Sequence, residues 1–273
     1  MTTHDTEIDY RAATDAGRDV WSSGDFNEIA RQTMAIAEDL CRAADPRPGQ
    51  AVLDVACGSG NVALIAARRC CDVTGIDIAA NLIERAHRRA DAEGSRIDFR
   101  VSDAQALPFP DARFDVVVSA IGVMFAPDQA RAAHELIRVC RPGGTIALAN
   151  WMPEAFGVDF FGAHARHAPP PPGMASPLRW GSEAGLRELI GPGTRSIRSE
   201  RRASFAYYRS IDHALEVFGR YFGPTIRAFN MVGEAGAAGL RRDLAAVFAR
   251  YNRADDGTAV IETEYLRTIA TRA

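Results

Sequence analysis

The chain has 273 residues, 47% of them hydrophobic, and a net charge of −3, and all of its 32 cationic side chains are arginine. The absence of lysine excludes Schiff-base and pyridoxal chemistry, the lysine-containing phosphate-binding loop and the protein-kinase signature. The slight negative charge does not favour a nucleic-acid or membrane-surface partner, and no apolar run reaches the ~18 residues of a membrane span.

The N-terminal segment predicts a helical cap over residues 1–48. Apolar residues recur there at helical spacing, and the pattern ends at the breaker sequence 45–49. The polar, acidic start is not a signal peptide, and five cysteines without C-x-x-C spacing are typical of free thiols in a reducing compartment. We therefore expect a cytoplasmic protein.

Strands and helices are expected to alternate between residues 49 and 150. The predicted strands are 51–56, 71–76, 97–101, 114–119 and 145–149, and the predicted helices are 61–69, 80–92 and 129–140. Such alternation is typical of a doubly wound, mostly parallel α/β sheet.

The regular alternation stops after Trp151. Segments 151–180 and 207–235 are rich in aromatic residues, and we expect them to be cap or lid insertions in a domain that spans 49–273. Further predicted elements are helices 182–190, 211–222 and 240–251, the last preceded by a glycine-rich turn at Gly233, Gly236 and Gly239, an extended segment 194–208 and a final strand 260–269.

A glycine turn follows the first predicted strand, at Gly58 and Gly60. Glycines at that place let the backbone approach a ligand, and the next helix offers free N–H groups and a positive dipole end. Asp54 lies inside the strand, while Asp77 and Asp103 end the second and third strands. Ligands of open α/β sheets bind at these carboxyl ends, where Asp77 can accept bonds from ribose hydroxyls and Asp103 from an adenine amine.

Five motifs, LDVACGSGN, GIDIAANLIERA, DAQALPF, FDVVVSAIGVMFAPD and LIRVCRPGGTIALANW, occur in this order. Together they resemble class I S-adenosylmethionine-dependent methyltransferases, most nearly the group that includes ubiquinone and menaquinone biosynthesis enzymes. The resemblance implies a seven-stranded sheet of order 3-2-1-4-5-7-6 with its last strand antiparallel, and S-adenosylmethionine as cofactor. The cofactor-binding positions that it implies are Asp54, Ala56, Gly58, Gly60, Asp77, Ile78, Asp103, Ala104, Ser119 and Ala120.

The expected reaction is direct in-line methyl transfer to an oxygen, nitrogen or carbon atom of a small metabolite. Because the sulfonium methyl is already electrophilic, a base is needed only for a protonated nucleophile. His164 and His167 follow the fifth strand and are candidate bases, although a structural role is open for each. We expect no metal, because Ser119 stands where metal-dependent relatives resemble one another in having a carboxylate. The expected assembly is a monomer or a homodimer.

Two other functions stay open at this point. The glycine pattern Gly58-x-Gly60-x-x-Ala63 together with Asp77 also fits an NAD(P)-dependent oxidoreductase, but that function leaves Asp103 and its motif unexplained. A non-catalytic cofactor-binding subunit would keep the same glycine turn.

Overall fold

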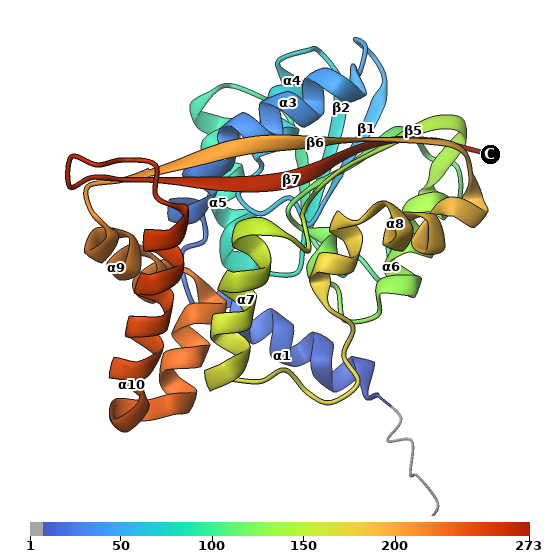
Figure 1. The fold of residues 1–273 in the computed structure, drawn as a ribbon. Helices are drawn as coiled ribbons and strands as arrows, with labels where there is room; N and C mark the ends of the chain where they lie inside the picture. Colours follow the sequence, from blue (N-terminus) through green and yellow to red (C-terminus); the bar gives the residue numbers. More distant parts are fainter. Residues whose placement is uncertain (1–7) are drawn as a thin grey trace, which may run out of the picture.

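Seven strands form one sheet in the computed structural model, which describes residues 8–273 (Figure 1). Their order is β3-β2-β1-β4-β5-β7-β6, and β7 runs antiparallel to both β5 and β6. The predicted fold class is thereby confirmed, including the inserted antiparallel last strand. The strands are β1 (Ala51–Val55), β2 (Asp72–Asp77), β3 (Asp98–Val101), β4 (Phe114–Ala120), β5 (Cys140–Trp151), β6 (Thr194–Tyr208) and β7 (Ala259–Arg272).

Helices cover both faces of this sheet. In Figure 1, α3 and α4 lie together on one face, and α6 and α8 lie on the other. The helices are α1 (Tyr10–Ser22), α2 (Asn27–Ala30), α3 (Met34–Ala44), α4 (Asn61–Ala67), α5 (Ala80–Ala92), α6 (Gln129–Val139), α7 (Ala155–His167), α8 (Glu183–Leu189), α9 (Ile211–Tyr221) and α10 (Gly223–Tyr251). Short 3-10 turns are η1 (Arg31–Thr33), η2 (Val123–Phe125), η3 (Pro177–Gly181) and η4 (Gly191–Gly193).

The central strands β1 and β4 are apolar on both faces because helices cover both sides of the sheet. All five residues of β1 are buried, and so are Val116, Val117 and Val118 of β4. A continuous apolar run of this kind is typical of a central parallel strand. Because these strands are buried, their carboxyl ends are held in a fixed geometry.

Two elements differ from the sequence-based expectation. β5 begins at Cys140, so the expected break at residues 141–144 is instead an irregularity in its pairing with β4. The helix predicted over 240–251 is longer, since α10 covers Gly223–Tyr251; the expected glycine turn is present as a kink at Gly233 (φ 60°, ψ −169°), whereas Gly236 and Gly239 are helical. A helical glycine costs about 1 kcal/mol relative to alanine, and here packing of α10 against α7 and α9 offsets that cost. An added Cβ at Gly239 would lie 3.3 Å from the His167 ring, so glycine allows this close approach.

The buried apolar residues form two separate clusters. The larger one, the sheet core, lies between the sheet and its covering helices. The second, which we call the cap core, joins α7, α9 and α10 to the far ends of β6 and β7. Figure 1 shows α1, α7, α9 and α10 gathered below the sheet. The cap core consists of Ile29, Phe156, Phe160, Ala163, Tyr208, Ala214, Leu215, Phe218, Phe222, Ala228, Leu240, Leu244, Val247, Phe248, Ala259 and Ile261.

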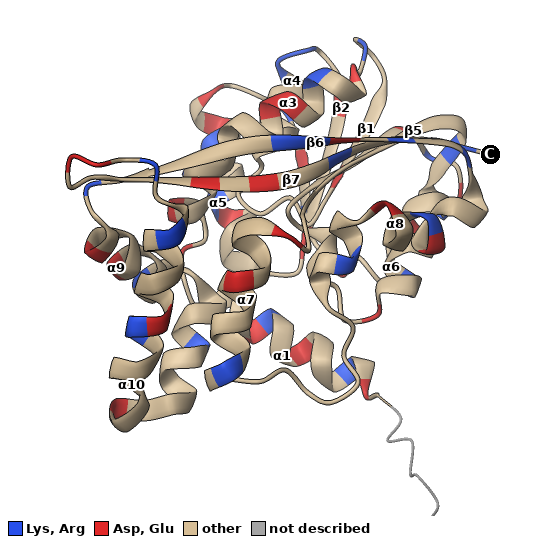
Figure 2. Cartoon of the chain, in the orientation of Figure 1, with Lys and Arg blue, Asp and Glu red and all other residues tan. Residues whose placement is uncertain are grey.

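Acidic and basic residues are interspersed over the chain in Figure 2. Arginines of the edge strand β6 pair with carboxylates of neighbouring elements: Arg201 with Glu154 and Glu264, and Arg202 with the buried Asp39 of α3. Charged side chains on an exposed edge oppose pairing with a further strand. None of the helices within residues 8–273 is long and apolar enough to cross a membrane.

Candidate functional site

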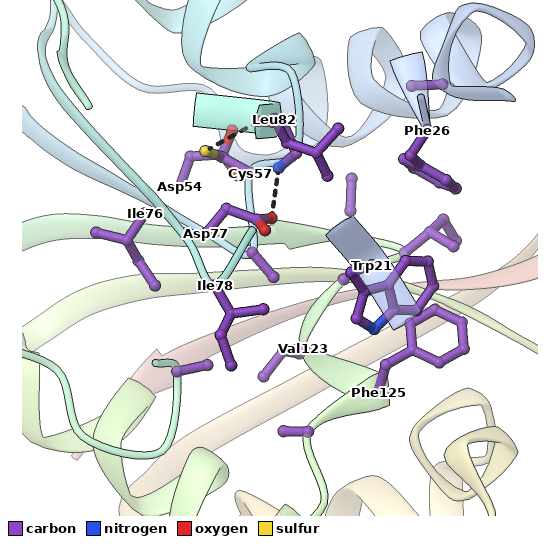
Figure 3. Close-up of a pocket in the computed structure, with 18 of the residues that line it drawn as sticks. Trp21, Phe26, Asp54, Cys57, Ile76, Asp77, Ile78, Leu82, Val123 and Phe125 are labelled. Carbon is purple, nitrogen blue, oxygen red and sulfur yellow. Dashed lines mark hydrogen bonds between the residues drawn. The ribbon is translucent and has the colours of Figure 1, made fainter. Parts of the chain in front are cut away.

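A pocket of about 1040 Å³ opens at the carboxyl ends of β1, β2, β3 and β4 (Figure 3). The residues that line it include three carboxylates, Asp54, Asp77 and Asp103, and no arginine. Trp21 and Phe125 lie side by side at one wall, with ring centroids 4.9 Å apart. The pocket therefore favours a nucleoside-sized ligand that carries positive charge. We call it the cofactor pocket.

Asp77 ends β2 and bridges two turns of the cofactor pocket. One carboxylate oxygen accepts a hydrogen bond from the Gly58 N–H (2.8 Å) and the other from the Ala79 N–H (2.9 Å). Burial raises its pKa, although these two amide bonds oppose the shift. A carboxylate has about four acceptor sites, so each oxygen keeps capacity for a ligand hydroxyl.

Asp54 lies inside β1 and fixes the start of α4. Its carboxylate accepts a hydrogen bond from the Ala63 N–H at 2.9 Å. Burial, with a smaller contribution from nearby Asp77, raises the pKa of Asp54 to about 7. The pocket thus holds a carboxyl group that gains negative charge near neutral pH.

The two glycines of the turn serve different purposes. Both have positive φ, 55° at Gly58 and 83° at Gly60. A Cβ added at Gly58 would meet only Phe26, at 3.9 Å, and would project into the pocket, whereas one at Gly60 would come within 2.9 Å of the Phe99 ring. Gly58 therefore leaves room for a ligand, and Gly60 allows the turn to pack on β3.

Asp103 follows β3 and is held by Gln105, which sequence reasoning did not single out as a site residue. The Gln105 side-chain amide donates to both oxygens of Asp103 (3.0 Å each) and lies 2.9 Å from Thr14 Oγ1 of α1. Its amide oxygen accepts from the Asp128 N–H at 2.7 Å. Gln105 thus links the loop after β3 to α1, which covers the cofactor pocket through Thr14, Gly17 and Trp21.

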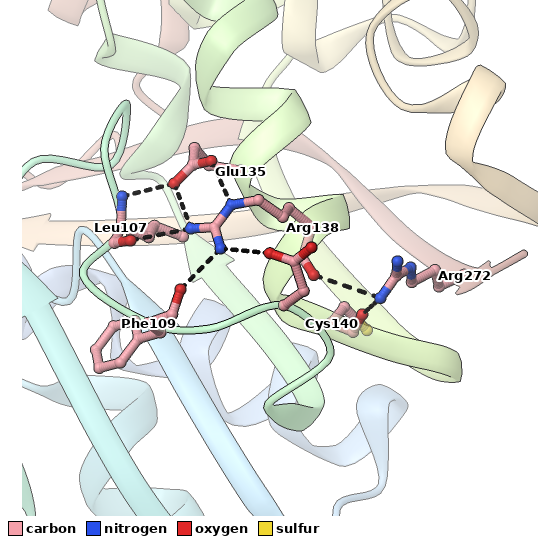
Figure 4. A network of polar contacts seen from close by, with 7 residues as sticks. Leu107, Phe109, Glu135, Arg138, Cys140 and Arg272 are labelled. Carbon is pink, nitrogen blue, oxygen red and sulfur yellow. Dashed lines mark hydrogen bonds and ion pairs between the residues drawn. The ribbon is translucent and has the colours of Figure 1, made fainter.

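A partly buried ion-pair network fixes this loop from behind (Figure 4). Arg138 of α6 makes a two-bond contact with Glu135 and also donates to the carbonyl oxygens of Leu107 and Phe109 and to Asp111. Glu135 in turn accepts from the Leu107 N–H at 2.7 Å. Because Arg138 bonds to Leu107, Phe109 and Asp111, α6 holds the second half of the loop that carries Asp103.

The remaining predicted positions divide into lining and supporting residues. Ala56, Ile78, Ala104 and Ala120 line the cofactor pocket. Ser119 is buried behind it, where its hydroxyl donates to the Val55 carbonyl (2.7 Å) and accepts from the Val123 N–H (2.9 Å). Trp21 and Phe125 also line the cofactor pocket; Phe125 belongs to the motif FDVVVSAIGVMFAPD and Trp21 to a segment of weaker resemblance, but neither was predicted as a site residue.

A second pocket of about 740 Å³ adjoins the first. Four residues, Phe26, Thr33, Ile121 and Phe125, line both. None of the described residues that line the second pocket is charged or a histidine, and most are aromatic or aliphatic. We call it the acceptor pocket. Its lining residues outside the shared four are Ile29, Gln32, Trp151, Phe156, Gly157, Phe160, Phe161, Ser204, Phe205, Ala206, Tyr208, Phe218, Phe222, Phe248, Ile261 and Thr263.

The two candidate bases line neither pocket. His164 is buried, with one ring nitrogen 2.8 Å from the Phe160 carbonyl and the other 2.8 Å from Thr225 Oγ1. Burial lowers its pKa. His167 lies 3.0 Å from Asp243 of α10. The structure therefore does not bring either histidine to the place where the two pockets meet.

The sheet order and the acidic pocket at its carboxyl edge are those of a Rossmann-like methyltransferase. A family model described as "Methyltransferase domain" matches residues 52–144. The chain belongs to the class I S-adenosylmethionine-dependent methyltransferases and is an enzyme of that kind.

The chain is similar over nearly its whole length to the uncharacterized protein Rv1405c of Mycobacterium tuberculosis, with 40% identity over 259 residues that cover 91% of each chain. It is 39% identical to the demethylmenaquinone methyltransferase of Thermus thermophilus over 112 residues, which cover 39% of this chain and 51% of that one. Among solved structures, the YcgJ protein of Bacillus subtilis superposes with a TM-score of 0.62 at 18% identity, covering 86% of this chain and 97% of that one. That likeness shows the fold.

Proposed function

We propose that this enzyme moves the methyl group of S-adenosylmethionine to an oxygen, nitrogen or carbon atom of a small, uncharged and largely apolar molecule. The observation that carries the proposal is the pairing of an acidic pocket with an apolar one, which meet at four shared residues. The first suits a cationic cofactor and the second an uncharged acceptor.

The residues of the cofactor pocket fit S-adenosylmethionine. Asp77 has acceptor capacity left for ribose hydroxyls, Asp103 and Ala104 line the same pocket after β3, and Gly58 leaves the space that a Cβ would fill. The cofactor supplies an electrophilic methyl group, so the protein must mainly align the acceptor and exclude water. The aromatic acceptor pocket does both.

The acceptor does not require a protein base in this proposal. The described lining of the acceptor pocket has no histidine, carboxylate or arginine, and His164 and His167 have structural partners. Suitable acceptor atoms are those that are nucleophilic without one, such as a neutral amine nitrogen or an electron-rich carbon. We propose a cytoplasmic metabolite as acceptor and not a nucleic acid. A site with carboxylates and without cationic side chains in its described lining would repel the phosphate backbone of a nucleic acid.

An oxidoreductase has less support than a methyltransferase. A dinucleotide would place two negatively charged phosphates in a pocket that holds three carboxylates and no arginine. Like charges at close range disfavour binding by several kcal/mol. The antiparallel β7 inserted between β5 and β6 is also absent from the usual dinucleotide-binding sheet.

Calorimetric titration with S-adenosylhomocysteine and, in parallel, with NADH tests the cofactor. We expect micromolar binding of the first and none of the second. Methyl transfer from labelled cofactor to apolar compounds in a metabolite extract then tests catalysis. Cofactor binding without any methylated product would instead favour a non-catalytic subunit, and no binding of S-adenosylhomocysteine at millimolar concentration would remove the proposal.

A further inference from the structure

The far ends of β6 and β7 form a two-stranded ribbon that reaches beyond the rest of the sheet. β5 pairs with β7 only as far as Trp151 and Tyr265, whereas β6 and β7 continue to pair up to Tyr208 and Ala259. Residues 203–208 and 259–264 therefore pair with each other and not with β5, and Ile261 also forms an isolated bridge with Asn252. One face of this ribbon is a wall of the acceptor pocket.

Side chains alternate between the two faces of the ribbon. Ser204, Ala206 and Tyr208 lie on one face, and Ser204 and Tyr208 are buried there. Tyr207, on the opposite face, is 61% exposed. This is the two-residue period of a strand with one face covered. Tyr208 thus points to the cap core and to the acceptor pocket, while its neighbour Tyr207 points away.

Tyr208 brings to the pocket a hydroxyl group for which the described residues provide no hydrogen-bond partner. The residue is 7% exposed, and its Oη takes part in no hydrogen bond among the described residues; Oη is not one of the fully buried polar atoms that lack a partner, so a small molecule can reach it. Of the other polar side chains of the pocket, Gln32 bonds to the backbone of Tyr207, Thr33 donates to the Ala30 carbonyl, and Thr263 donates to the Ser204 carbonyl. Ser204 Oγ and Trp151 Nε1, like Tyr208 Oη, make no hydrogen bond among the described residues, and the phenol is the most acidic donor of the three. A phenol hydroxyl that lines a pocket and has no protein partner is free to bond to a ligand.

The ring of Tyr208 is held in place by its neighbours. Its centroid lies 6.3 Å from that of Phe218, 6.5 Å from that of Phe248 and 6.1 Å from that of His213. His213 is not its partner in this structure, because Nδ1 of that ring accepts from the Arg209 N–H and no hydrogen bond joins the ring to the phenol. Burial raises the pKa of Tyr208, so the hydroxyl keeps its proton and acts as a donor.

We propose that the Tyr208 hydroxyl donates a hydrogen bond to an uncharged oxygen of the methyl acceptor, namely a carbonyl, ether or hydroxyl oxygen, and so selects oxygenated apolar molecules. This inference rests on the proposed function, because it assigns a role in the same acceptor pocket. Tyr208 is not among the four residues shared with the cofactor pocket. It therefore holds the acceptor at a point away from the methyl group and is a specificity residue.

The class of acceptor follows from this arrangement. A carboxylate, phosphate or ammonium group would lose its hydration in a pocket without a charged partner, which is strongly unfavourable. An apolar molecule without an oxygen would leave the Tyr208 hydroxyl unsatisfied. A site built to bond an oxygen rejects the analogue that lacks it. The fitting acceptor is an uncharged, ring-containing molecule with an oxygen remote from the methylated atom.

Two fluorescent naphthalenes test the inference without knowledge of the natural acceptor. 6-Propionyl-2-(dimethylamino)naphthalene has a ketone oxygen, and 2-(dimethylamino)naphthalene is the same ring without it. We expect Tyr208→Phe to weaken binding of the ketone about fivefold, as for one neutral hydrogen bond, and to leave binding of the plain ring unchanged. The emission of the ketone should shift to the blue when the bond is lost.

Tyr207→Phe is the matched control, because it removes the same hydroxyl from the next residue on the outer face and should change neither affinity. Equal effects of Tyr208→Phe on both probes, no effect on either, or failure of the wild type to bind the ketone would overturn the inference. S-adenosylhomocysteine affinity, measured on the same three proteins, should stay constant. If the wild type does not bind S-adenosylhomocysteine, the proposed function is wrong. If it binds S-adenosylhomocysteine but Tyr208→Phe does not discriminate between the two probes, only the role of Tyr208 is wrong.

Discussion

The cofactor pocket and the acceptor pocket share a boundary but differ in how they are built. The first lies at strand ends, and its carboxylates Asp54 and Asp77 are held by backbone N–H groups. The second lies between helix faces and the β6–β7 ribbon, and side chains alone define it. One pocket is acidic, and the other has no charged residue in its described lining.

This difference matches the two ligands that we propose for the pockets. A pocket for one constant cofactor gains from fixed backbone geometry, because small shifts of a turn would misplace several hydrogen bonds together. A pocket for a variable acceptor gains from side chains that can be exchanged while the strands stay in place. Because the sheet core and the cap core are separate, side chains of the acceptor pocket can be exchanged without disturbing the turns of the cofactor pocket.

The largest expected effect comes from Phe160→Ala in the cap core. The Phe160 ring is almost fully buried and has centroid distances of 5.1 Å to Phe156 and 5.2 Å to Phe218. We expect the free energy of unfolding to fall by about 3 kcal/mol, near the lower end for buried phenylalanine because the ring also lines a pocket. Urea unfolding measures this change.

The cofactor affinity of folded Phe160→Ala should stay within about twofold of wild type, since the two cores are separate. Val158→Ala, on the exposed side of the same helix, is the control and should change stability little. A large loss of cofactor affinity in Phe160→Ala would show that the two regions are one coupled unit.

Asp77→Asn tests the other pocket. The amide keeps the shape of the carboxylate but loses its charge, and its NH₂ group would face an N–H donor of Gly58 or Ala79. We expect affinity for S-adenosylhomocysteine to fall about tenfold to hundredfold, equivalent to ~1.5–3 kcal/mol. Calorimetry measures it, with Asp72→Asn at the exposed start of β2 as control. Unchanged affinity would remove Asp77 from the cofactor site.

The strand-end pocket could be predicted from the sequence because its signals are local. The glycine turn, and aspartates placed at or after strand ends, follow from the strand and helix periods, and the parallel sheet brings them together. Ala56, Gly58 and Ala104 indeed line one pocket with the three aspartates. Gln105 escaped notice because its role depends on Thr14, which lies 91 positions away along the chain.

The acceptor pocket could not be derived in the same way. Its lining comes from helices and a ribbon whose packing is set by non-local contacts, as between Phe26 and Phe222. An aromatic residue in such a segment looks the same in sequence whether it packs inward or lines a cavity. His164 illustrates the problem, since it follows β5 as a base would, yet bonds to Thr225 instead.

Stability at different pH values should separate the pockets further. The pKa of Asp54 is raised to about 7 from 3.8, so its neutral form is favoured by folding. Its contribution is present in full below pH ~4 and is lost as the pH rises through 7. We expect the melting temperature of the wild type to decline between pH 5.5 and 8 more than that of Asp54→Asn.

Carboxylates with lowered pKa, such as Asp39 and Glu135, do not obscure this comparison, because their contributions are lost only at acidic pH. Binding of the cationic cofactor should reverse the decline in the wild type, since it favours ionised Asp54. Equal pH profiles for wild type and Asp54→Asn would mean that Asp54 is ionised throughout this range.

The smallest expected effect concerns the boundary of the cofactor pocket at α1. Gln105→Leu removes the bonds that join Asp103 and the loop after β3 to Thr14. Losing one net hydrogen bond of ~1 kcal/mol should raise the open population of α1 about fivefold. Hydrogen exchange of amides in α1 should quicken, and cofactor affinity should fall a few-fold, whereas binding of apolar probes to the acceptor pocket should not change. Gln50→Leu is the matched control, because Gln50 lies just before β1, away from the carboxyl ends of the strands, and its side-chain oxygen accepts from the Arg47 N–H. If exchange in α1 stays as in the wild type, α1 is held by its contacts with α5 and α10 and not by Gln105.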